Sequence, residues 1–319
     1  MAIILDGKKV SQNILKNLKL EVENILEKTN KKPSLAVILV GNDYPSHVYV
    51  FNKLKKAKEI GIKPYLFVAN ATIDPKGILK QAKKFSLKDI FENNFLKEDI
   101  VFIKENLKEK DLLNLIEFLN KHENISGILV QLPLPEGFDT QKVINAINPD
   151  KDVDGFHPIN MGKTLIGLKD ALFPCTPKGV IRLLKEYNIK IQGQNVCMVG
   201  AGLIVGKPLS AMFLNENATI TTCHIYTKNL KEHTLKADIL CSATGVPHLI
   251  KEDMVKEGAI VVDIGISRLN GKIVGDVDFE NVKRKASFIT PVPGGVGPMT
   301  IAMLMENTIL AFKKALNLN

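Results

Sequence analysis

The first half of the chain alternates between amphipathic helical patterns and short runs that are apolar throughout. Apolar residues recur at helical spacing from just after Gly7, at Val10, Ile14, Leu18, Val22 and Ile25, which predicts a helix with one buried face. Residues 34–40 (SLAVILV) and 127–132 (GILVQL) are apolar on both faces, as strands inside a parallel sheet are. We expect further helices over 46–60, with Ser46 as the N-cap, 108–120 and 140–147, and a strand over 62–68.

Residues 69–107 do not follow this pattern. They are rich in Lys, Phe and Asn, and their helical fragments lack a clean period. We interpret this segment as a peripheral insertion.

The second half of the chain again alternates strand and helix. Strands are predicted over 196–199, 219–223, 239–242, 260–264 and 287–290, and helices over 176–187, 203–215, 230–236 and 299–316. Such alternation is typical of a parallel sheet. We therefore predict an α/β protein of two α/β domains with a cleft between them. Residues 1–150 form the first domain, on which the helix 299–316 packs back, and residues 151–298 form the second, a Rossmann-like doubly wound parallel sheet.

Composition narrows the class of protein. The net charge of +9, from 43 basic and 34 acidic residues, would suit a nucleic-acid partner. The lysines, however, are spread along helices and Trp is absent, so no aromatic and basic stacking platform is predicted. We interpret most of this charge as solvated surface, and a local basic cleft that attracts anionic ligands stays open.

Cysteine usage and the N-terminus bear on the compartment. The cysteines at 175, 197, 223 and 241 lack the paired spacing of a metal site, which favours reduced thiols in a reducing compartment. No run approaches the roughly 18 apolar residues of a membrane span. Asp6, Lys8 and Lys9 interrupt the early apolar run, so we expect no signal peptide and a cytoplasmic location.

Residues 195–208 (NVCMVGAGLIVGKP) combine an apolar strand, a sharp turn that Gly200 and Gly202 allow, and a helix predicted from Leu203. A doubly wound sheet holds a dinucleotide phosphate on such a turn, where N–H groups and the helix dipole favour negative charge. The match to the usual fingerprint is imperfect, because the third glycine, Gly206, comes one place late and Pro208 follows it. A tight connection between a strand and a helix is the alternative interpretation.

A few polar residues could carry chemistry. Tyr49 and Lys53 are four apart on a predicted helix and so share a face, although such a pair is usually ordinary surface. Gln131 ends a buried strand, the place where α/β sheets bind ligands, or else it satisfies a loop. Asp154 could accept hydrogen bonds from a ring nitrogen or an amine, or belong with Lys151 and Asp152 to a solvated loop, residues 151–160. His157 is a weak candidate base. No Ser/His/Asp set, paired catalytic carboxylates or metal cluster is evident.

Together these segments closely resemble the bifunctional methylenetetrahydrofolate dehydrogenase/methenyltetrahydrofolate cyclohydrolase family (FolD). The resemblance runs nearly end to end. It rests on residues 46–62 (SHVYVFNKLKKAKEIGI), 127–135 (GILVQLPLP), 148–163 (NPDKDVDGFHPINMGK), 173–179 (FPCTPKG), 200–208 (GAGLIVGKP) and 288–300 (FITPVPGGVGPMT), in the family's order.

The resemblance implies a function in one-carbon metabolism. The family oxidises 5,10-methylenetetrahydrofolate with NAD or NADP and hydrolyses the methenyl product to 10-formyltetrahydrofolate. Lys53 matches its catalytic lysine, Tyr49 the tyrosine that stacks on the folate, Gln131 the glutamine that holds the lysine, and Asp154 the aspartate that reads the pterin. Further implied substrate contacts are Ser46, Leu132, Pro293, Gly294 and Gly295, and implied cofactor contacts are Gly200, Ala201, Gly202, Val205, Gly206, Ile225 and Ile266. The family also implies a homodimer, polyglutamylated tetrahydrofolates as substrates, no metal, no nucleic acid and no membrane.

The sequence departs from the family in three places. Ala201 and Gly202 stand where the family usually has Arg and Ser, and Ile225 where it often has Ser. Two contacts to the 2′-phosphate of NADP are therefore missing, although Lys207 or Lys228 could replace the charge. Yet no acidic residue ends the strand 219–223 to bind a free ribose. We expect weakened NADP preference. The span from Lys53 to Gln131 is also longer than usual, which could alter dimer contacts or substrate access.

Two other functions stay open within the family. A monofunctional dehydrogenase would lack the lysine, and Lys53 is present. A folate-binding protein that has lost hydride transfer would be explained by the altered glycine loop.

Overall fold

The computed structural model of the protein describes residues 2–77, 79–92 and 98–318. It divides into two compact units. Residues 15–160 and 304–319 form one, called here the 15–160 unit, and residues 1–14 and 161–303 form the other, the 161–303 unit. This division differs from the predicted boundaries, because residues 1–14 group with the second unit and 151–160 with the first. The helices α1 (Gly7–Thr29), α6 (Pro158–Ile166) and α11 (Val296–Ala315) each contribute residues to both units.

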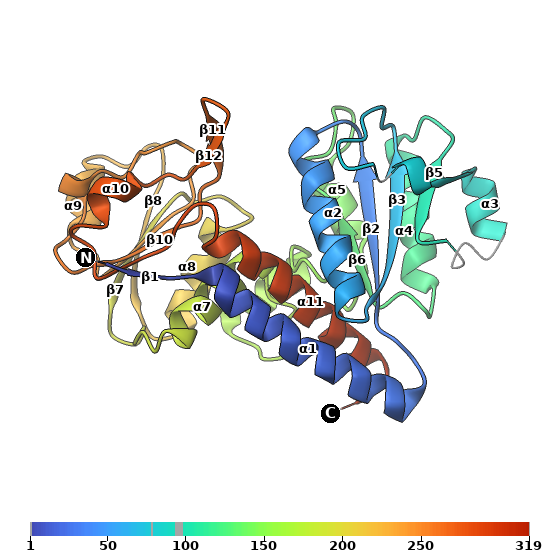
Figure 1. Ribbon diagram of the computed structural model, residues 1–319, viewed down its shortest axis with the longest axis horizontal. Helices are drawn as coiled ribbons and strands as arrows, with labels where there is room; N and C mark the ends of the chain where they lie inside the picture. Colours follow the sequence, from blue (N-terminus) through green and yellow to red (C-terminus); the bar gives the residue numbers. More distant parts are fainter. Residues whose placement is uncertain (1, 78, 93–97, 319) are drawn as a thin grey trace. The chain divides into compact units, whose positions relative to one another are not determined.

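The 15–160 unit is built on a parallel sheet with the order β4-β5-β3-β2-β6 (Figure 1). Its strands are β2 (Ser34–Val40), β3 (Lys63–Ala69), β4 (Lys83–Phe85), β5 (Ile100–Ile103) and β6 (Gly127–Val130). Its helices are α2 (Tyr44–Glu59), α3 (Leu87–Glu92), α4 (Glu109–Lys121), α5 (Thr140–Ala146) and the 3₁₀ turn η1 (Leu79–Gln81). The predicted helices and strands outside 69–107 are confirmed to within a few residues.

Every residue of β2 is buried, because helices cover both faces of this sheet. On one face, Ala36 and Ile38 join a core with apolar residues of α4 and α5, such as Leu112 and Val143. On the other face α2 packs against β2 and β3. Because the strands are parallel, the loops after β2, β3 and β6 lie at the same, carboxyl edge of the sheet, the edge where α/β sheets bind ligands.

The final helix contributes to this unit, as predicted. Asn307 of α11 donates to the Val153 carbonyl at 2.9 Å and is fully buried. Lys313 pairs with Glu21 of α1 at 3.2 Å. The helix begins at Val296 rather than at residue 299, since Pro298 in a first turn has no N–H to leave unpaired.

Two expectations for the 15–160 unit are wrong. Ser46 is not the N-cap of α2, because Asp43 caps the helix by accepting the Ser46 N–H. Residues 69–107 are not merely a peripheral insertion, because β5 lies inside the sheet between β3 and β4. Residues 78 and 93–97 of that segment lie outside the described residues.

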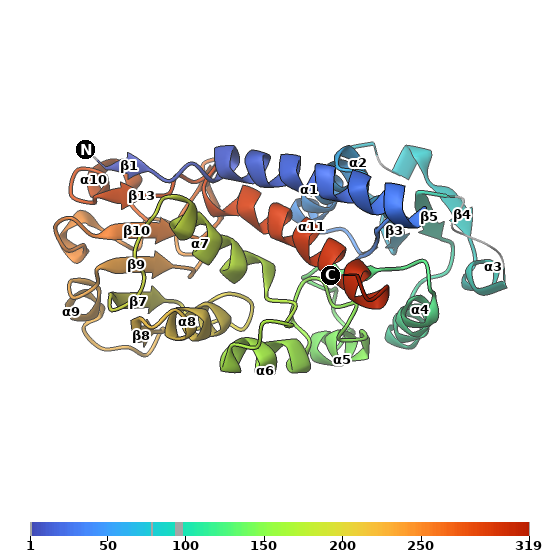
Figure 2. The same ribbon diagram turned by 90° about the horizontal axis from the view of Figure 1, so that it is seen from below.

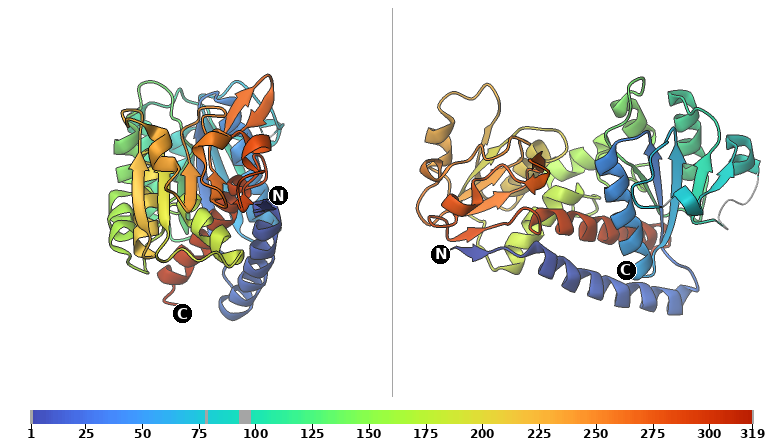
Figure 3. Two further views of the ribbon diagram at one scale, coloured as in Figure 1. Left: turned by 90° about the vertical axis from the view of Figure 1, so that its left-hand side faces the viewer. Right: turned by 45° about the horizontal axis from the view of Figure 1, so that its top comes forward.

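The 161–303 unit is built on a second parallel sheet, with the order β1-β13-β10-β9-β7-β8 (Figure 2). Its strands are β1 (Ile3–Ile4), β7 (Asn195–Val199), β8 (Thr219–Cys223), β9 (Ile239–Ser242), β10 (Ile260–Asp263) and β13 (Phe288–Ile289). The pair β11 (Ser267–Leu269) and β12 (Lys272–Val274) forms a separate antiparallel hairpin, visible in Figure 3. Its helices include α7 (Cys175–Glu186), α8 (Gly206–Asn215), α9 (Leu230–Thr234), α10 (Phe279–Val282) and the 3₁₀ turn η3 (Glu252–Met254).

This sheet is doubly wound, as predicted. The chain leaves β7 for β8 on one side and then returns to β9 on the other side of β7. The carboxyl ends of β7 and β9 therefore form the topological switch point, where open α/β sheets bind their ligands. The sequence analysis did not predict β1, η3, the β11–β12 hairpin, α10 or α6, which begins inside the expected polar loop 151–160.

Candidate functional site

Helix α2 carries three of the predicted substrate residues on one face. Ser46, Tyr49 and Lys53 follow at intervals of three and four residues, which places them one above the other. Asp43 fixes the start of this helix, because its Oδ2 accepts the Ser46 N–H at 2.9 Å and the Ser46 hydroxyl at 2.6 Å. Tyr49 keeps 38% of its surface exposed, and Lys53 is half-buried.

Strand β6 delivers Gln131 to the same face. Its N–H donates to the Ile38 carbonyl at 2.9 Å and so extends the ladder by one residue past the strand end. Its side-chain Oε1 accepts a hydrogen bond from Lys53 Nζ at 3.0 Å. Its Nε2 donates to the Leu132 carbonyl at 2.7 Å, and this bond orients the amide with its oxygen toward the lysine.

The Leu132 carbonyl joins the two segments a second time. It accepts from Gln131 Nε2 and also from the Ser46 hydroxyl at 3.3 Å. The peptide bond that follows, Leu132–Pro133, is cis. The structure thus brings Ser46, Lys53, Gln131 and Leu132 together, as the sequence predicted.

Asp154 is positioned by a buried neighbour. Asp152 is only 2% exposed, and its carboxylate accepts from the backbone of Gly155, Phe156 and His157 and from Asn160 Nδ2, at 2.8–3.3 Å. Burial raises the pKa of Asp152, against the lowering effect of these donors. Asp152 also pairs with Ile128 of β6 as an isolated parallel bridge, so Asp154 lies toward the same sheet edge as Gln131.

The solvated-loop interpretation of residues 151–160 is therefore wrong for Asp152, and also for Lys151. The Lys151 ammonium donates to the carbonyls of Leu119, Asn120 and His122 at 2.7–3.1 Å. It thus caps the C-terminal end of α4, where the helix dipole favours a cation. Burial lowers the pKa of Lys151. No sequence pattern signalled either role, because both depend on partners that the fold supplies.

His157 has a local structural role. Its Nδ1 accepts the Ile159 N–H at 3.1 Å, at the start of α6.

The glycine turn after β7 is sterically tight. Gly200 has φ +106°, and a Cβ there would lie 2.4 Å from the Ala243 carbonyl oxygen. A Cβ on Gly206 would lie 1.9 Å from the Gly200 carbonyl oxygen. Gly202 meets no such restriction, since nothing lies within 4 Å of its Cβ position. Hence the tight turn depends on Gly200 and Gly206, and the prediction that Gly202 is needed to turn the backbone is wrong.

The helix after this turn starts later than predicted. Residues 203–205 are a turn and α8 begins at Gly206, with Val205 as its N-cap residue. In its first turn the Lys207 N–H donates to the Gly202 carbonyl at 3.0 Å and Pro208 has no N–H, so Gly206 is the one of these three residues whose N–H is left for a ligand. The positive end of the helix dipole favours an anion at this end of α8.

Two further predicted cofactor contacts are open to solvent. Ile225 is 92% exposed in the turn after β8, and Ile266 after β10 is also exposed. His224 holds this turn, because it donates its N–H to the Thr227 hydroxyl and accepts the Thr227 N–H, both at 2.8 Å. An apolar side chain therefore stands where a 2′-phosphate contact would be expected.

The loop 291–298 is anchored to the start of the chain. Gly294 has φ +110°, and its carbonyl accepts the Lys8 N–H at 2.9 Å. A Cβ on Gly7 would lie 1.9 Å from the Gly295 carbonyl oxygen. The loop also contains a cis bond at Val292–Pro293. Sequence reasoning missed Gly7 and Lys8, which support the predicted contacts Pro293, Gly294 and Gly295 from the other end of the chain.

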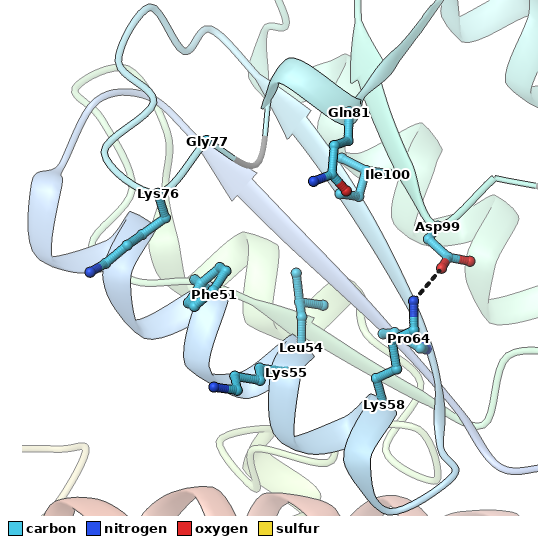
Figure 4. Close-up of a pocket in the computed structure, with 10 residues that line it drawn as sticks. All are labelled: Phe51, Leu54, Lys55, Lys58, Pro64, Lys76, Gly77, Gln81, Asp99 and Ile100. Carbon is cyan, nitrogen blue, oxygen red and sulfur yellow. Dashed lines mark ion pairs between the residues drawn. The ribbon is translucent and has the colours of Figure 1, made fainter.

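A separate cavity of about 220 Å³ lies on the other flank of α2 (Figure 4). Its walls are Phe51, Leu54, Lys55, Lys58, Pro64, Lys76, Gly77, Gln81, Asp99 and Ile100. Lys58 pairs with Asp99 across 3.7 Å. None of the predicted site residues lines this cavity, so α2 presents Lys53 and Lys55 to different surroundings.

The described residues contain neither a membrane-spanning helix nor a metal cluster. No helix there is long and apolar enough to span a bilayer. Within the same residues, no group of three or more His, Cys, Asp or Glu side chains is arranged to hold a metal ion.

Known proteins resemble this chain over nearly its whole length. The family model described as the tetrahydrofolate dehydrogenase/cyclohydrolase catalytic domain matches residues 5–92 and 84–154, and that of its NAD(P)-binding domain matches residues 174–316. The chain is 52% identical over 314 residues to a bifunctional protein FolD of Aquifex aeolicus, covering 98% of this chain and 96% of the relative.

Solved structures agree with these matches. The bifunctional enzyme FolD of Campylobacter jejuni superposes with a TM-score of 0.84 at 43% identity, covering 98% of this chain and 99% of that one. A Trypanosoma brucei dehydrogenase-cyclohydrolase, complexed with NADP and an inhibitor, gives a TM-score of 0.83 at 31% identity, with 99% and 98% covered. The chain therefore belongs to the tetrahydrofolate dehydrogenase/cyclohydrolase family.

Proposed function

We propose that this chain oxidises 5,10-methylenetetrahydrofolate with a nicotinamide dinucleotide and hydrolyses the methenyl product to 10-formyltetrahydrofolate. The observation that carries the second activity is the 3.0 Å hydrogen bond from Lys53 Nζ to Gln131 Oε1, with the amide orientation fixed by Leu132. It favours the bifunctional enzyme over a monofunctional dehydrogenase, because a dehydrogenase alone has no need of a held amine.

Lys53 acts in the hydrolysis. Water adds to the methenyl carbon and must lose a proton, and the Lys53 side chain accepts it as a general base. Gln131 Oε1 takes one N–H of the amine, which fixes the direction of the nitrogen lone pair. The ammonium that forms then returns this proton to the departing ring nitrogen as the one-carbon bridge opens, and the remaining hydroxyl proton leaves to solvent as that oxygen becomes the formyl oxygen.

Tyr49 and Asp154 bind the folate. The exposed ring of Tyr49 offers an apolar face on which a flat heterocycle stacks. The Asp154 carboxylate accepts two N–H bonds from the pterin, a strong and orienting contact. Ser46 and Leu132 keep α2 and the end of β6 together beneath this surface, and Pro293, Gly294 and Gly295 add backbone contacts to the substrate.

The residues of the 161–303 unit fit a dinucleotide. Gly200 and Gly206 allow the tight turn after β7, and the N-terminus of α8, with the Gly206 N–H and the positive end of the helix dipole, would face a phosphate. The rest of the dinucleotide would be lined by Ala201, Gly202, Val205, Ile225 and Ile266. When bound, the nicotinamide accepts a hydride from the substrate. The protein's own contribution to that step is orientation.

The dinucleotide preferred is NAD, or NAD and NADP about equally. The turn after β8 presents Ile225 where the family resemblance implies a serine that contacts the 2′-phosphate, and an apolar side chain gains nothing from that charge. Initial dehydrogenase rates at matched NAD and NADP concentrations test this. A strong preference for NADP contradicts it and would direct attention to Lys207 and Lys228 as replacement charges.

The finer biological setting rests on family membership. We propose a homodimer that works in the cytoplasm on polyglutamylated tetrahydrofolates. We assign folate binding to the domain of residues 1–150 and dinucleotide binding to the domain of residues 151–298. Light scattering tests the dimer, and the ratio of kcat/KM for polyglutamate and monoglutamate substrates tests the tail preference.

Absorbance separates the two activities. Formation of methenyltetrahydrofolate requires the dinucleotide, whereas its decay by hydrolysis does not. We expect the purified protein to catalyse both reactions. Methenyl decay at the uncatalysed rate would leave a monofunctional dehydrogenase, and absence of dinucleotide-dependent formation would leave a folate-binding protein.

A further inference from the structure

Two carboxyl groups are buried together beneath the carboxyl edge of the second sheet. Asp263 ends β10 and is 3% exposed, and Asp276 follows β12 and is fully buried. The Asp276 N–H donates to Asp263 Oδ1 at 3.0 Å, so the two residues are in contact. Burying one carboxylate is costly and burying two neighbours is more so, which calls for a reason.

Asp263 holds the chain that returns from the β11–β12 hairpin. Besides Asp276 N–H, its carboxylate accepts from Gly265 N at 3.1 Å and Val277 N at 2.9 Å. The Asp263 N–H donates to the Thr290 hydroxyl at 2.7 Å, which ties it to the neighbouring strand. These bonds fix where Asp276 stands.

Asp276 reaches across to the end of β9. Its Oδ2 accepts from the Ser242 hydroxyl at 2.8 Å, the Thr244 N–H at 2.6 Å and the Thr244 hydroxyl at 2.9 Å. The Thr244 hydroxyl in turn accepts the Val246 N–H at 3.2 Å. A single oxygen atom therefore sets the course of residues 243–246, called here the β9 loop.

The β9 loop packs against the glycine turn after β7. Ala243 lies inside the loop, its N–H bonds the Val199 carbonyl at 2.8 Å, and its carbonyl oxygen fills the space beside Gly200 where a Cβ would be. Because β7 and β9 are adjacent in the sheet (Figure 2), this contact sits at the switch point. A displacement of the β9 loop would be transmitted directly to the Gly200 turn.

The other oxygen of Asp276 shows that the arrangement is not optimised for stability alone. Oδ1 is buried and has no hydrogen-bond partner in the described part of the chain. A Cβ on Gly265 would lie 1.9 Å from it, so an α-hydrogen of that glycine points at the oxygen. Such a C–H contact compensates weakly, and a well-packed neutral residue would cost less than a half-satisfied carboxylate.

We propose that Asp276 is a positioning residue for the dinucleotide: its carboxylate holds the β9 loop against the Gly200 turn and so sets the geometry of the phosphate cradle. The inference rests on the proposed use of a nicotinamide dinucleotide by this unit. It assigns Ser242, Thr244 and Gly265, which contact the Asp276 carboxylate, to the same device.

The test is Asp276→Asn in the full-length protein, which keeps the shape and replaces charge-assisted bonds by neutral ones. Binding of NAD or NADP is measured directly by calorimetric titration, beside methenyl hydrolysis and thermal unfolding. We expect the dinucleotide Kd to rise about tenfold, the worth of roughly one strengthened hydrogen bond. Methenyl hydrolysis, which uses no dinucleotide, should stay within about twofold of wild type, a free-energy change of only about 0.4 kcal/mol.

Asp238→Asn is the matched control. Asp238 accepts the Asn195 N–H at 2.9 Å and pairs with Lys256 at the amino edge of the same sheet. Its replacement should lower the Tm without changing the Kd. If Asp276→Asn also lowers only the Tm and leaves the Kd within twofold, the residue is structural and the inference is wrong. Should that variant fail to fold, Thr244→Val removes one of the bonds to Oδ2 and must raise the Kd instead. Absence of dinucleotide binding by the wild type would count against the proposed function itself.

Discussion

Lys53 Nζ and Gln131 Oε1 lie 3.0 Å apart, although 78 residues separate them in the chain. The lysine comes from α2, which covers one face of the first sheet, and the glutamine from the residue after β6 at its carboxyl edge. Because Gln131 Nε2 is engaged by the Leu132 carbonyl, the amide presents only its oxygen to the amine. The sheet register therefore determines the orientation of the proposed base.

Replacing Lys53 should separate the two activities. We expect Lys53→Met to slow methenyl hydrolysis by about 10²–10⁴-fold, the usual contribution of a positioned general base, while dinucleotide-dependent methenyl formation persists. The methionine keeps the apolar stem, so the fold should be retained. Stopped-flow decay of the methenyl absorbance measures the loss.

Lys55→Met is the matched control for this prediction. Lys55 lies on the same helix two residues on, where it lines the separate cavity of Figure 4. Its hydrolysis rate should equal that of wild type. Hydrolysis at the wild-type rate by Lys53→Met would remove the lysine from the mechanism.

Gly200 and Gly202 in the turn after β7 should respond differently to replacement by alanine. Gly200→Ala places a methyl group 2.4 Å from the Ala243 carbonyl oxygen at a positive φ, so the turn must shift. We expect dinucleotide affinity to fall by at least about tenfold, since both backbone strain and a displaced donor set act against binding. Gly202→Ala meets no protein atom within 4 Å, so it should leave the turn in place and lower the affinity less than Gly200→Ala does. Equal affinities for the two variants in a fluorescence titration would contradict a cradle at Gly200.

Strands and site residues were predictable where the signal is local. The run 34–40 is apolar at every position, and it forms β2 with these bounds because burial on both faces demands that composition. Helix spacing placed Tyr49 and Lys53 on one face, and the strand-end rule placed Gln131 at the carboxyl edge of the sheet. The grouping of Lys53 with Gln131, Ser46 and Leu132 came from the family resemblance. Family resemblance supplied their roles, which spacing alone left open.

The failures share a different cause. Strand β5 was missed because its neighbours β3 and β4 make it a strand, whereas the sequence around it carries no regular period. Asp152 was interpreted as solvated because the sequence around it does not indicate that four hydrogen-bond donors surround its carboxylate. Strand β1 forms only by pairing with β13, near the other end of the chain. Such features depend on contacts distant in sequence, which local patterns cannot report.

Asp152 should matter to stability more than its exposed neighbour. Asp152→Ala leaves the N–H groups of Gly155, Phe156 and His157 without their acceptor inside the unit. We expect the free energy of unfolding to fall by about 2–4 kcal/mol, since unsatisfied buried donors carry their full desolvation cost. The folate KM should rise as Asp154 loses its support. Asp150→Asn, which loses only an exposed pair with Lys314, should change stability by less than about 1 kcal/mol. Urea unfolding distinguishes the two.

Asp263 should give the protein an unusual pH dependence of stability. Burial raises the pKa of Asp263 to about 7, with the charge of Asp276 adding to this and backbone donors from Val277 and Asp276 opposing it. In the unfolded chain the pKa returns to its ordinary value of 3.8. Between these values the folded state keeps a proton that the unfolded state has lost. The free energy of unfolding should therefore fall as pH rises from about 4 to 7, by at most about 1.4 kcal/mol per pH unit from this group.

Asp263→Asn isolates this contribution, because the amide cannot titrate yet resembles the protonated carboxyl in shape. The difference between wild type and variant should be smallest near pH 4 and should shift steadily in the variant's favour up to about pH 7, then stay constant. Urea midpoints at half-unit pH intervals give the two curves. Other carboxylates titrate alike in both proteins and cancel in the difference. A difference that is flat across this window would mean that Asp263 is ionised throughout, and that its N–H donors outweigh the cost of burial.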